Sequence, residues 1–383
     1  MTAEIAARRP GLVPLSFRLS ARPPAAPYHG RMRRRTMLAV AAGATLAGCS
    51  SRAAPAPAPA IVHQPGVVTP PPEFATLIAL DVAGAGLGAS LGRIATLVAQ
   101  VHASKAATVT VAAGASLFDD RFGLSEVRPQ HLTAMPSFPN DVLDPAQCHG
   151  DLLLQICAER RDLVAAVAAD LTRPEGLTAR WRCDGFRAEN RTTPGGLPTT
   201  RNLFGFREGA GNPDPRDDAL MDRVVWARDG EPAWAAGGTY QVVRMIRFAT
   251  ELWDRDPVSH QEAILGRRRD DGTPLSGGTE DAHVSYDADP DGRSTPLDSH
   301  IRRADPRTPG SERHRILRRG YSYRKGLDQG LIFICFQRDV QAGFATVQNR
   351  LTGEALQRYV LPFGGGYYFV PSSIDVLRGL TTS

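Results

Sequence analysis

The chain has 383 residues, 42% of them hydrophobic, and a formal net charge of +5 at pH 7. This hydrophobic fraction supports a sizeable core and excludes wholesale disorder. The positive charge does not indicate nucleic-acid binding, because residues 1–49 contain eight arginines and one acid and so carry +7. The rest of the chain carries −2 and is mildly acidic.

Residues 1–49 have the layout of an export signal. The stretch Arg33–Leu38 resembles a twin-arginine signal, with Met37 where Phe is more usual. The apolar run Met37–Ala47 is too short to span a bilayer and fits the hydrophobic region of a signal peptide. It ends in Leu46–Cys49 (LAGC), which resembles a bacterial lipobox. The alternative is an ordinary signal peptide with an incidental cysteine.

Residues 50–72 are rich in proline and alanine, a composition typical of a semi-rigid, extended spacer. We therefore expect a linker between Cys49 and a globular domain that covers residues 73–383. If Cys49 is lipidated, the protein is an exported lipoprotein that is anchored to a membrane outside the cytoplasm.

The hydrophobic periodicity predicts an α+β fold with two similar halves, at about residues 73–200 and 201–383. In the first half it predicts strands at 74–83, 109–113 and 178–186, a helix at 91–103, and a strand that runs into a helix over 152–170. In the second half it predicts strands at 238–249, 331–337 and 367–371, and helices from about 257 and over 340–351. This order is typical of tandem ferredoxin-like units, each with helices on an antiparallel sheet.

Four cysteines follow the leader, and they form no CxxC pair that would indicate a redox dithiol or a zinc knuckle. An exported protein can form disulfides, so Cys183 could pair with Cys148 or Cys157. Cys335 lies in an apolar strand, and we expect it to be buried.

Three residues are candidates for chemistry, although each has an ordinary alternative. His300, in SHIRRADPR, could ligate a metal through one ring nitrogen, but most single histidines have no such role. Arg318, in ILRRGYSY, could stabilise negative charge, or belong to a solvated basic loop. Glu208, in NLFGFREGAGNP, could transfer protons, or be an exposed turn residue.

Together these segments resemble the dye-decolourising peroxidases, haem enzymes that have a GxxDG motif, a proximal histidine and a distal arginine. The resemblance is greatest to the exported, deferrochelatase-like branch. Further segments that carry it, in the family's order, are FATLIALDVA (74–83), VTVAAGASLFDDRFGL (109–124), MPSFPNDVLDPAQCHGDLLLQICAE (135–159), GGTYQVVRMIRFATELWDR (237–255), HQEAILGRRRDDGTPLSG (260–277) and GGGYYFVPS (364–372).

The resemblance implies a role for each candidate. His300 would be the axial iron ligand, and Arg318 and Glu208 would assist cleavage of the peroxide bond. Glu208 departs from the family pattern, which has Asp at this position. The resemblance also implies haem contacts from residues Gly209, Ala210, Gly211, Arg267, Asp305, Pro306, Arg307 and Arg318, although Arg267 could equally form a surface salt bridge.

The function that the resemblance implies is a haem peroxidase with one haem b per chain, between the sheet and the helices of the second half. It would use H2O2 to oxidise dyes, phenols or similar substrates through a ferryl intermediate. The alternative is a haem-binding lipoprotein that releases iron for iron acquisition. The sequence has no P-loop, GxSxG, HExxH or nucleic-acid motif, and it is compatible with a homo-oligomer.

Overall fold

The structure is a computed structural model that describes residues 62–381. The predicted export signal and most of the predicted linker lie outside the described residues. Within 62–381, every helix is too short or too polar to cross a lipid bilayer.

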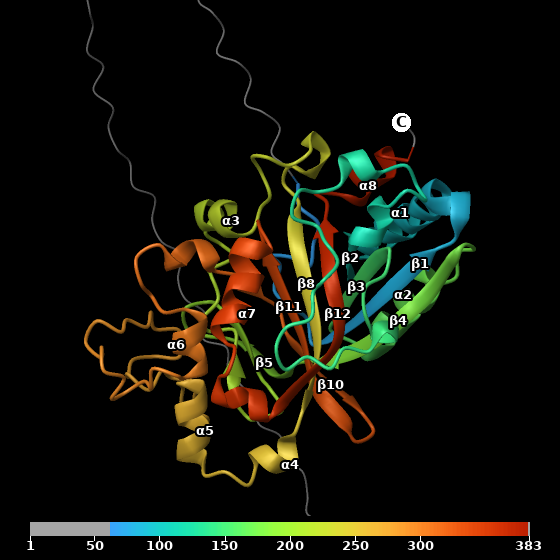
Figure 1. Ribbon diagram of the computed structural model, residues 1–383. Helices are drawn as coiled ribbons and strands as arrows, with labels where there is room; N and C mark the ends of the chain where they lie inside the picture. The colour runs from blue at the N-terminus through green and yellow to red at the C-terminus, as the bar shows by residue number, and fades with distance from the viewer. Residues whose placement is uncertain (1–61, 382–383) are drawn as a thin grey trace, which may run out of the picture. The chain divides into compact units, whose positions relative to one another are not determined.

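The first half has the strand and helix order β-α-β-β-α-β that the periodicity predicts (Figure 1). Its strands lie in the order β4-β1-β3-β2, and all the neighbours are antiparallel. This is the ferredoxin-like arrangement. The elements are β1 (Phe74–Val82), α1 (Leu87–Ser104), β2 (Thr108–Gly114), β3 (Leu152–Ala158), α2 (Arg161–Leu171) and β4 (Leu177–Phe186).

The second half repeats this arrangement, since its strands lie in the order β12-β8-β11-β10. In both halves the order is therefore fourth, first, third and second strand. The main elements are β8 (Thr239–Phe248), α4 (Thr250–Trp253), α5 (Val258–Leu265), α6 (His300–Ala304), β9 (Leu317–Arg318), β10 (Tyr321–Lys325), β11 (Asp328–Gln337), α7 (Thr346–Arg350), β12 (Val360–Val370) and α8 (Ile374–Gly379). The α+β class and the two ferredoxin-like halves are confirmed.

The sheets of the two halves are joined at both edges. Strand β2 pairs with β12, and β4 pairs with β10, so the sheet closes on itself. Successive side chains of a strand point to opposite faces of a sheet, so each strand contributes to two cores. Leu77, Leu153, Val243 and Ile332 belong to the core that gathers side chains from all eight paired strands. The alternate side chains of the first-half strands, such as Ile78, Val111 and Leu154, pack against helices α1 and α2 in a second core.

Three short strands between the halves were not predicted. They are β5 (Ala188–Thr192), β6 (Pro198–Arg201) and β7 (Arg207–Glu208), and they form a separate antiparallel sheet. Their residues are mostly polar and carry no apolar alternation, so periodicity cannot find them. The predicted boundary between the halves, after residue 200, falls inside β6. Helix α3 (Asp218–Val224) follows this sheet.

Two other segments differ in detail from the expected pattern. The strand-like segment that begins at Arg318 is the short strand β9 followed by a hairpin, in which Gly326 and Leu327 join β10 to β11. Gly326 has a φ of 61°, a conformation that glycine adopts without strain. The helix expected over 340–351 begins with a π-helical turn (Gln341–Ala345) before α7.

The end of the predicted linker packs against the fold. The side chain of Gln64 bonds to the backbone of Val111 and Pro371, and the ring of His63 stacks on Trp226 with centroids 3.6 Å apart. The prediction of a semi-rigid linker up to residue 72, with the globular domain beginning at residue 73, was therefore wrong for the last residues of the linker. Its proline-rich composition concealed the buried side chains Gln64 and Val67.

All four described cysteines are free thiols and buried. The disulfides that the sequence left open, between Cys183 and Cys148 or Cys157, are therefore not formed in this structure. The expectation that Cys335 is buried is confirmed.

Candidate active site

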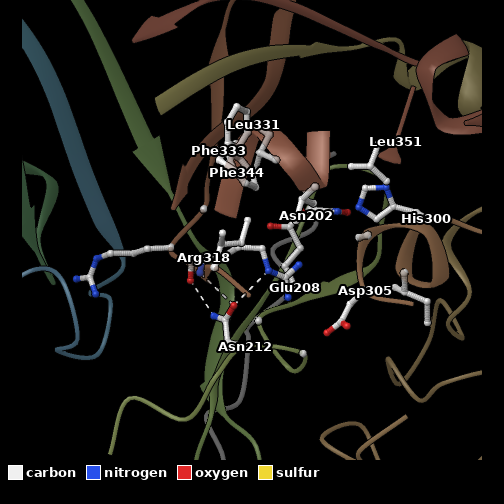
Figure 2. Close-up of a pocket in the computed structure, with 18 of the residues that line it drawn as sticks. Asn202, Glu208, Asn212, His300, Asp305, Arg318, Leu331, Phe333, Phe344 and Leu351 are labelled. Carbon is white, nitrogen blue, oxygen red and sulfur yellow. Dashed lines mark hydrogen bonds between the residues drawn. The ribbon is translucent and has the colours of Figure 1, made fainter. Parts of the chain in front are cut away.

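A cavity of about 320 Å³ lies between the second-half sheet and helices α6 and α7. It lies on the face of this sheet that points away from the core shared by the eight strands. Alternate residues of β8 and β11, which point to the same face, give it an apolar wall. That wall includes Ile246, Phe248, Leu331 and Phe333, and Phe344 of the π-helical turn extends it. The charged residues labelled in Figure 2 come from several elements: His300 begins α6 and Asp305 follows it, Glu208 belongs to β7, and Arg318 belongs to β9.

His300 begins helix α6 and lies at the cavity, where Figure 2 shows its ring near Leu351. Its Nδ1 lies 2.8 Å from Oε2 of Glu354, a buried carboxylate that precedes η8 (Ala355–Arg358). Burial lowers the pKa of His300, but Glu354 raises it, and the net shift is upward. This bond fixes the ring and leaves Nε2 without a protein partner among the described residues.

Glu208 belongs to β7 and is half-buried at the cavity. Nδ2 of Asn202 donates a hydrogen bond of 2.8 Å to Oε1 of Glu208. Asn202 is itself fixed, because its Oδ1 accepts bonds of 3.0 Å from the backbone N–H groups of Phe204 and Phe206. The carboxylate is therefore oriented by a buried amide and is not an exposed turn acid.

Arg318 belongs to β9 and also lines the cavity. Asn212 bonds it three times: Oδ1 accepts from the backbone N–H (3.1 Å) and from Nε (3.2 Å), and Nδ2 donates to the backbone carbonyl (2.8 Å). Burial lowers the pKa of Arg318, and the charge of Glu208 opposes this shift most strongly. The guanidinium nevertheless stays charged at neutral pH. The alternative of a solvated loop arginine does not fit this geometry.

We call Asn202, Glu208, Asn212 and Arg318 the distal wall. The stretch from Gly209 to Gly211 runs along the cavity between Glu208 and Asn212. A Cβ at Gly209, whose φ is 108°, would lie 2.3 Å from the carbonyl oxygen of Pro198. This position therefore requires glycine. Gly211 lies close to Arg318, since a Cβ there would be 3.3 Å from its Nη2.

A group of arginines gathers at another part of the cavity. Arg267 donates to the carbonyls of Gly272 (2.7 Å) and Glu280 (2.8 Å), and burial together with Arg318 lowers its pKa to about 10. Arg307 pairs with Asp305 at 3.2 Å. Arg267 is therefore bonded to the protein through backbone oxygens, and the surface salt bridge that was its alternative is not formed.

Arg315 also lines this part of the cavity, and burial lowers its pKa. Its backbone N–H donates to the carbonyl of Glu312 (3.1 Å), but its guanidinium has no hydrogen bond or ion pair to another described residue. Pro306, by contrast, is absent from the described lining of the cavity, although its neighbours Asp305 and Arg307 are present. Its predicted haem contact is therefore not supported by the geometry.

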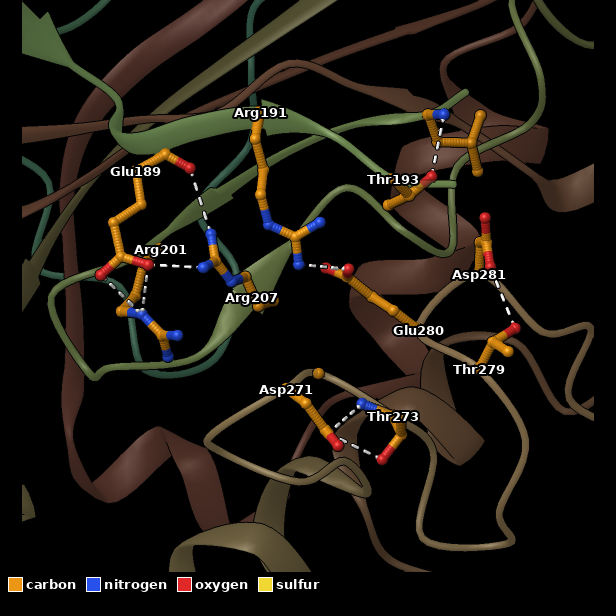
Figure 3. A network of polar contacts seen from close by, with 12 residues as sticks. Glu189, Arg191, Thr193, Arg201, Arg207, Asp271, Thr273, Thr279, Glu280 and Asp281 are labelled. Atoms are coloured by element: carbon orange, nitrogen blue, oxygen red, sulfur yellow. Dashed lines mark hydrogen bonds and ion pairs between the residues drawn. The ribbon is translucent and has the colours of Figure 1, made fainter. Parts of the chain in front are cut away.

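A surface network supports the loop that carries Arg267 (Figure 3). Arg191 of β5 pairs with Glu280 at 2.6 Å, and the backbone N–H of Gly195 donates to Asp281 at 2.6 Å. Glu189 accepts from Arg201 and Arg207 on the neighbouring strands. The unpredicted sheet β5–β6–β7 therefore fixes both Glu208 and the loop of Arg267.

The sequence interpretation missed three residues of this site. Asn202 and Asn212 bracket the quoted motif NLFGFREGAGNP, but asparagines beside glycines are usually interpreted as turn formers. Glu354 lies 54 residues after His300, and no local pattern connects the two. A buried acid near a predicted ligand histidine is found only when the structure brings the two together.

The comparisons with known proteins agree with this geometry. Residues 64–187 match the family described as "Dyp-type peroxidase, N-terminal", and residues 199–375 match "Dyp-type peroxidase, C-terminal". The chain belongs to the Dyp-type peroxidase family. The resemblance stated from the sequence motifs is thus confirmed.

Among curated proteins, the chain is 49% identical over 272 residues to Deferrochelatase from Escherichia coli (strain K12), an alignment that covers 68% of this chain and 64% of that protein. The chain therefore spans less than two thirds of that relative's length. Among solved structures, it is similar to a DyP-type peroxidase from Cellulomonas bogoriensis (36% identity, TM-score 0.71, 81% of this chain and 92% of that one). It is also similar to ferric DtpA from Streptomyces lividans (32% identity, TM-score 0.74, 82% and 92%).

Proposed function

We propose that the protein is a haem-dependent peroxidase that uses H2O2 to oxidise dyes, phenols or similar reducing substrates. The observation that carries this proposal is one cavity that contains both a carboxylate-bound histidine, His300, and an oriented pair, Glu208 and Arg318. A haem carrier needs the histidine but not the pair. The family membership supports the same conclusion.

The residues of the cavity fit a haem. No group of three or more His, Cys, Asp or Glu side chains suited to a metal ion occurs among residues 62–381. A single imidazole suits a metal whose other positions are filled by a porphyrin. The apolar wall suits the porphyrin faces, and Arg267, Arg307 and Arg315 suit its two propionates. His300 would ligate the iron through Nε2, with Glu354 strengthening it as a donor.

When bound, haem supplies the iron and the electrons that reduce peroxide. The distal wall performs the proton transfers. Glu208 would accept a proton from one oxygen of the peroxide and return it to the other oxygen, which leaves as water. Arg318 stabilises the negative charge that develops on the leaving oxygen. Asn202 and Asn212 keep both groups oriented, so little reorganisation is needed.

The glutamate in place of the family's aspartate is compatible with this role. Its side chain is longer by one methylene, and Asn202 fixes Oε1 at 2.8 Å. Its Oε2 lies near Gly320, where a Cβ would be 3.2 Å away. The longer side chain is therefore accommodated between an amide and a glycine.

A second function is the removal of iron from haem in iron acquisition, which the similarity to proteins named Deferrochelatase favours. One experiment separates the two. Purified holoprotein is mixed with H2O2 in a stopped-flow spectrometer, and in parallel incubated with a ferrous chelator and a reductant. A peroxidase shows a rapid Soret change and oxidises phenols without releasing iron. Slow reaction with peroxide together with iron release and intact porphyrin would support the second function.

We also propose that the protein is exported and anchored through Cys49, on the support of the twin-arginine-like and lipobox-like motifs alone. Membrane fractionation tests this proposal. The wild-type protein should sediment with membranes, and the Cys49→Ala variant should be soluble or unprocessed. Mass spectrometry that finds an unlipidated N-terminus beyond Cys49 in the wild type would contradict it.

A further inference from the structure

Arg187 is a buried cation at the cavity that the proposed mechanism does not use. It lies between β4 and β5, is 4% exposed, and is part of the cavity lining. Its backbone N–H donates to Glu73, so its position is fixed by the sheet. No motif of the sequence pointed to it.

The hydrogen-bond partners of Arg187 are all neutral. Nε donates to Oδ1 of Asn190 (2.9 Å), Nη1 donates to the carbonyl of Gly320 (2.8 Å), and the guanidinium lies 5.6 Å from the ring centroid of Tyr321. A buried charge is costly unless an opposite charge compensates it. Burial accordingly lowers the pKa of Arg187, to about 10, and Glu208 is the carboxylate that opposes this shift.

Gly320 connects Arg187 to the distal wall. Its carbonyl accepts from Arg187, and its Cα faces the other side, where a Cβ would lie 3.2 Å from Oε2 of Glu208. The negative charge of the Glu208 carboxylate is therefore attracted by two guanidinium groups. One belongs to Arg318 of the distal wall, and the other belongs to Arg187, on the far side of Gly320.

We propose that Arg187 is a positioning residue that fixes Gly320 beside Glu208 and provides a second positive charge favouring an anion in the cavity. The inference rests on the proposed peroxidase function. When Glu208 takes a proton from HOOH, one O–H bond breaks and another forms on the carboxylate. The negative charge moves from Glu208 to the hydroperoxide ion, within the cavity that Arg187 and Arg318 both line. Arg187 thus stabilises the negative charge both before this transfer, on Glu208, and after it, on the anion in the cavity.

The test measures anion affinity instead of activity. Ferric holoprotein is titrated with azide, an anion, and with nitric oxide, a neutral ligand, at one pH. The Arg187→Gln variant should bind azide roughly tenfold more weakly, since it lacks one charge near the ligand, while its affinity for nitric oxide is unchanged. Arg187→Lys should recover most of the loss. Arg182→Gln, which removes an exposed arginine of the preceding strand β4, should behave as wild type.

An unchanged ratio of azide to nitric oxide affinity in Arg187→Gln would overturn the inference. If that variant does not retain haem, Asn190→Ala decides, because it keeps the charge but removes the acceptor of Nε. It should weaken azide binding by a smaller factor, and an unchanged ratio there would equally overturn the inference. A wild-type protein that binds no haem, or whose haem does not react with peroxide, would instead contradict the proposed function.

Discussion

The ring of His300 is bound to a carboxylate that lies 54 residues further along the chain, with Nδ1 of His300 2.8 Å from Oε2 of Glu354. The bond joins helix α6 to the segment before β12 and orients Nε2. Because the carboxylate is buried, with 6% of its side chain exposed, solvent does not compete strongly for it. Because of this bond, Nε2 of His300 should donate its electron pair to a metal more strongly than the nitrogen of an isolated imidazole.

The first prediction concerns this pair. Glu354→Gln should retain the fold and bind haem, but haem affinity should fall by about 10–100-fold, as is typical when the partner of a ligand histidine is changed. The rate of haem transfer to apomyoglobin measures the loss. Glu312→Gln, which changes an exposed acid of the segment Ser311–His314, is the control. Equal transfer rates in both variants would show that Glu354 has no such role.

The second prediction concerns the proton transfer. Glu208→Gln should retain haem and slow the reaction with peroxide by roughly 10²–10⁴-fold, whereas Glu208→Asp should stay active. Arg318→Leu should be at least as damaging, because charge stabilisation is the larger effect. Stopped-flow measurement of the Soret change at one pH compares the three variants. If Glu208→Gln reacts with peroxide at the wild-type rate while Arg318→Leu reacts much more slowly, Glu208 is not the acid–base residue, and catalysis depends on Arg318 and water.

Much of the fold followed from the sequence because its strands are long and strongly apolar. The run LLLQICA of β3 is buried on both faces, so its composition indicated a strand, although the boundary between this strand and the helix after it was not predicted. The polar sheet β5–β6–β7 has no such signal. The packed segment at His63 was concealed by its proline-rich surroundings, because composition does not show which side chains find partners in a distant strand.

Sequence motifs predicted the three central residues of the candidate site but not the residues that support them. His300, Glu208 and Arg318 belong to quoted segments, and the structure brings all three to one cavity. Their supporting residues, such as Glu354 and Arg187, belong to other elements and become neighbours only in the folded structure. Their roles depend on distance and burial, which a single sequence does not contain.

The third prediction concerns pH. Burial lowers the pKa of His63 below its usual 6.5, so the unfolded chain binds more protons than the folded chain below that pH. The contribution of His63 to the free energy of unfolding is therefore complete above pH 6.5, and it declines as the pH falls through this value. In His63→Phe, which preserves a ring against Trp226, the decline in stability should be smaller. Melting temperatures at about pH 7.5 and about pH 5.5 test this. An equal decline in both proteins would refute it.

The fourth prediction concerns the buried ion pair of Arg244 and Asp141, which connects β8 to a loop of the first half. Both side chains are almost fully buried. Asp141→Asn leaves the Arg244 charge uncompensated and should lower the free energy of unfolding by about 3–5 kcal/mol. Urea unfolding measures the loss. Asp162→Asn, which removes the partner of the exposed Arg160, should leave the urea midpoint unchanged. Similar midpoints in the two variants would contradict the prediction.

The haem content of His300→Ala tests the central claim most directly. His314 also lines the cavity, and its Nδ1 lies 2.5 Å from the backbone oxygen of Ala342, so His314→Ala is a matched control. The account predicts that His300→Ala folds but loses tight haem binding and its Soret band, while His314→Ala retains both. A His300→Ala variant that purifies with full haem and an unchanged Soret band would contradict the assignment of His300 as the iron ligand.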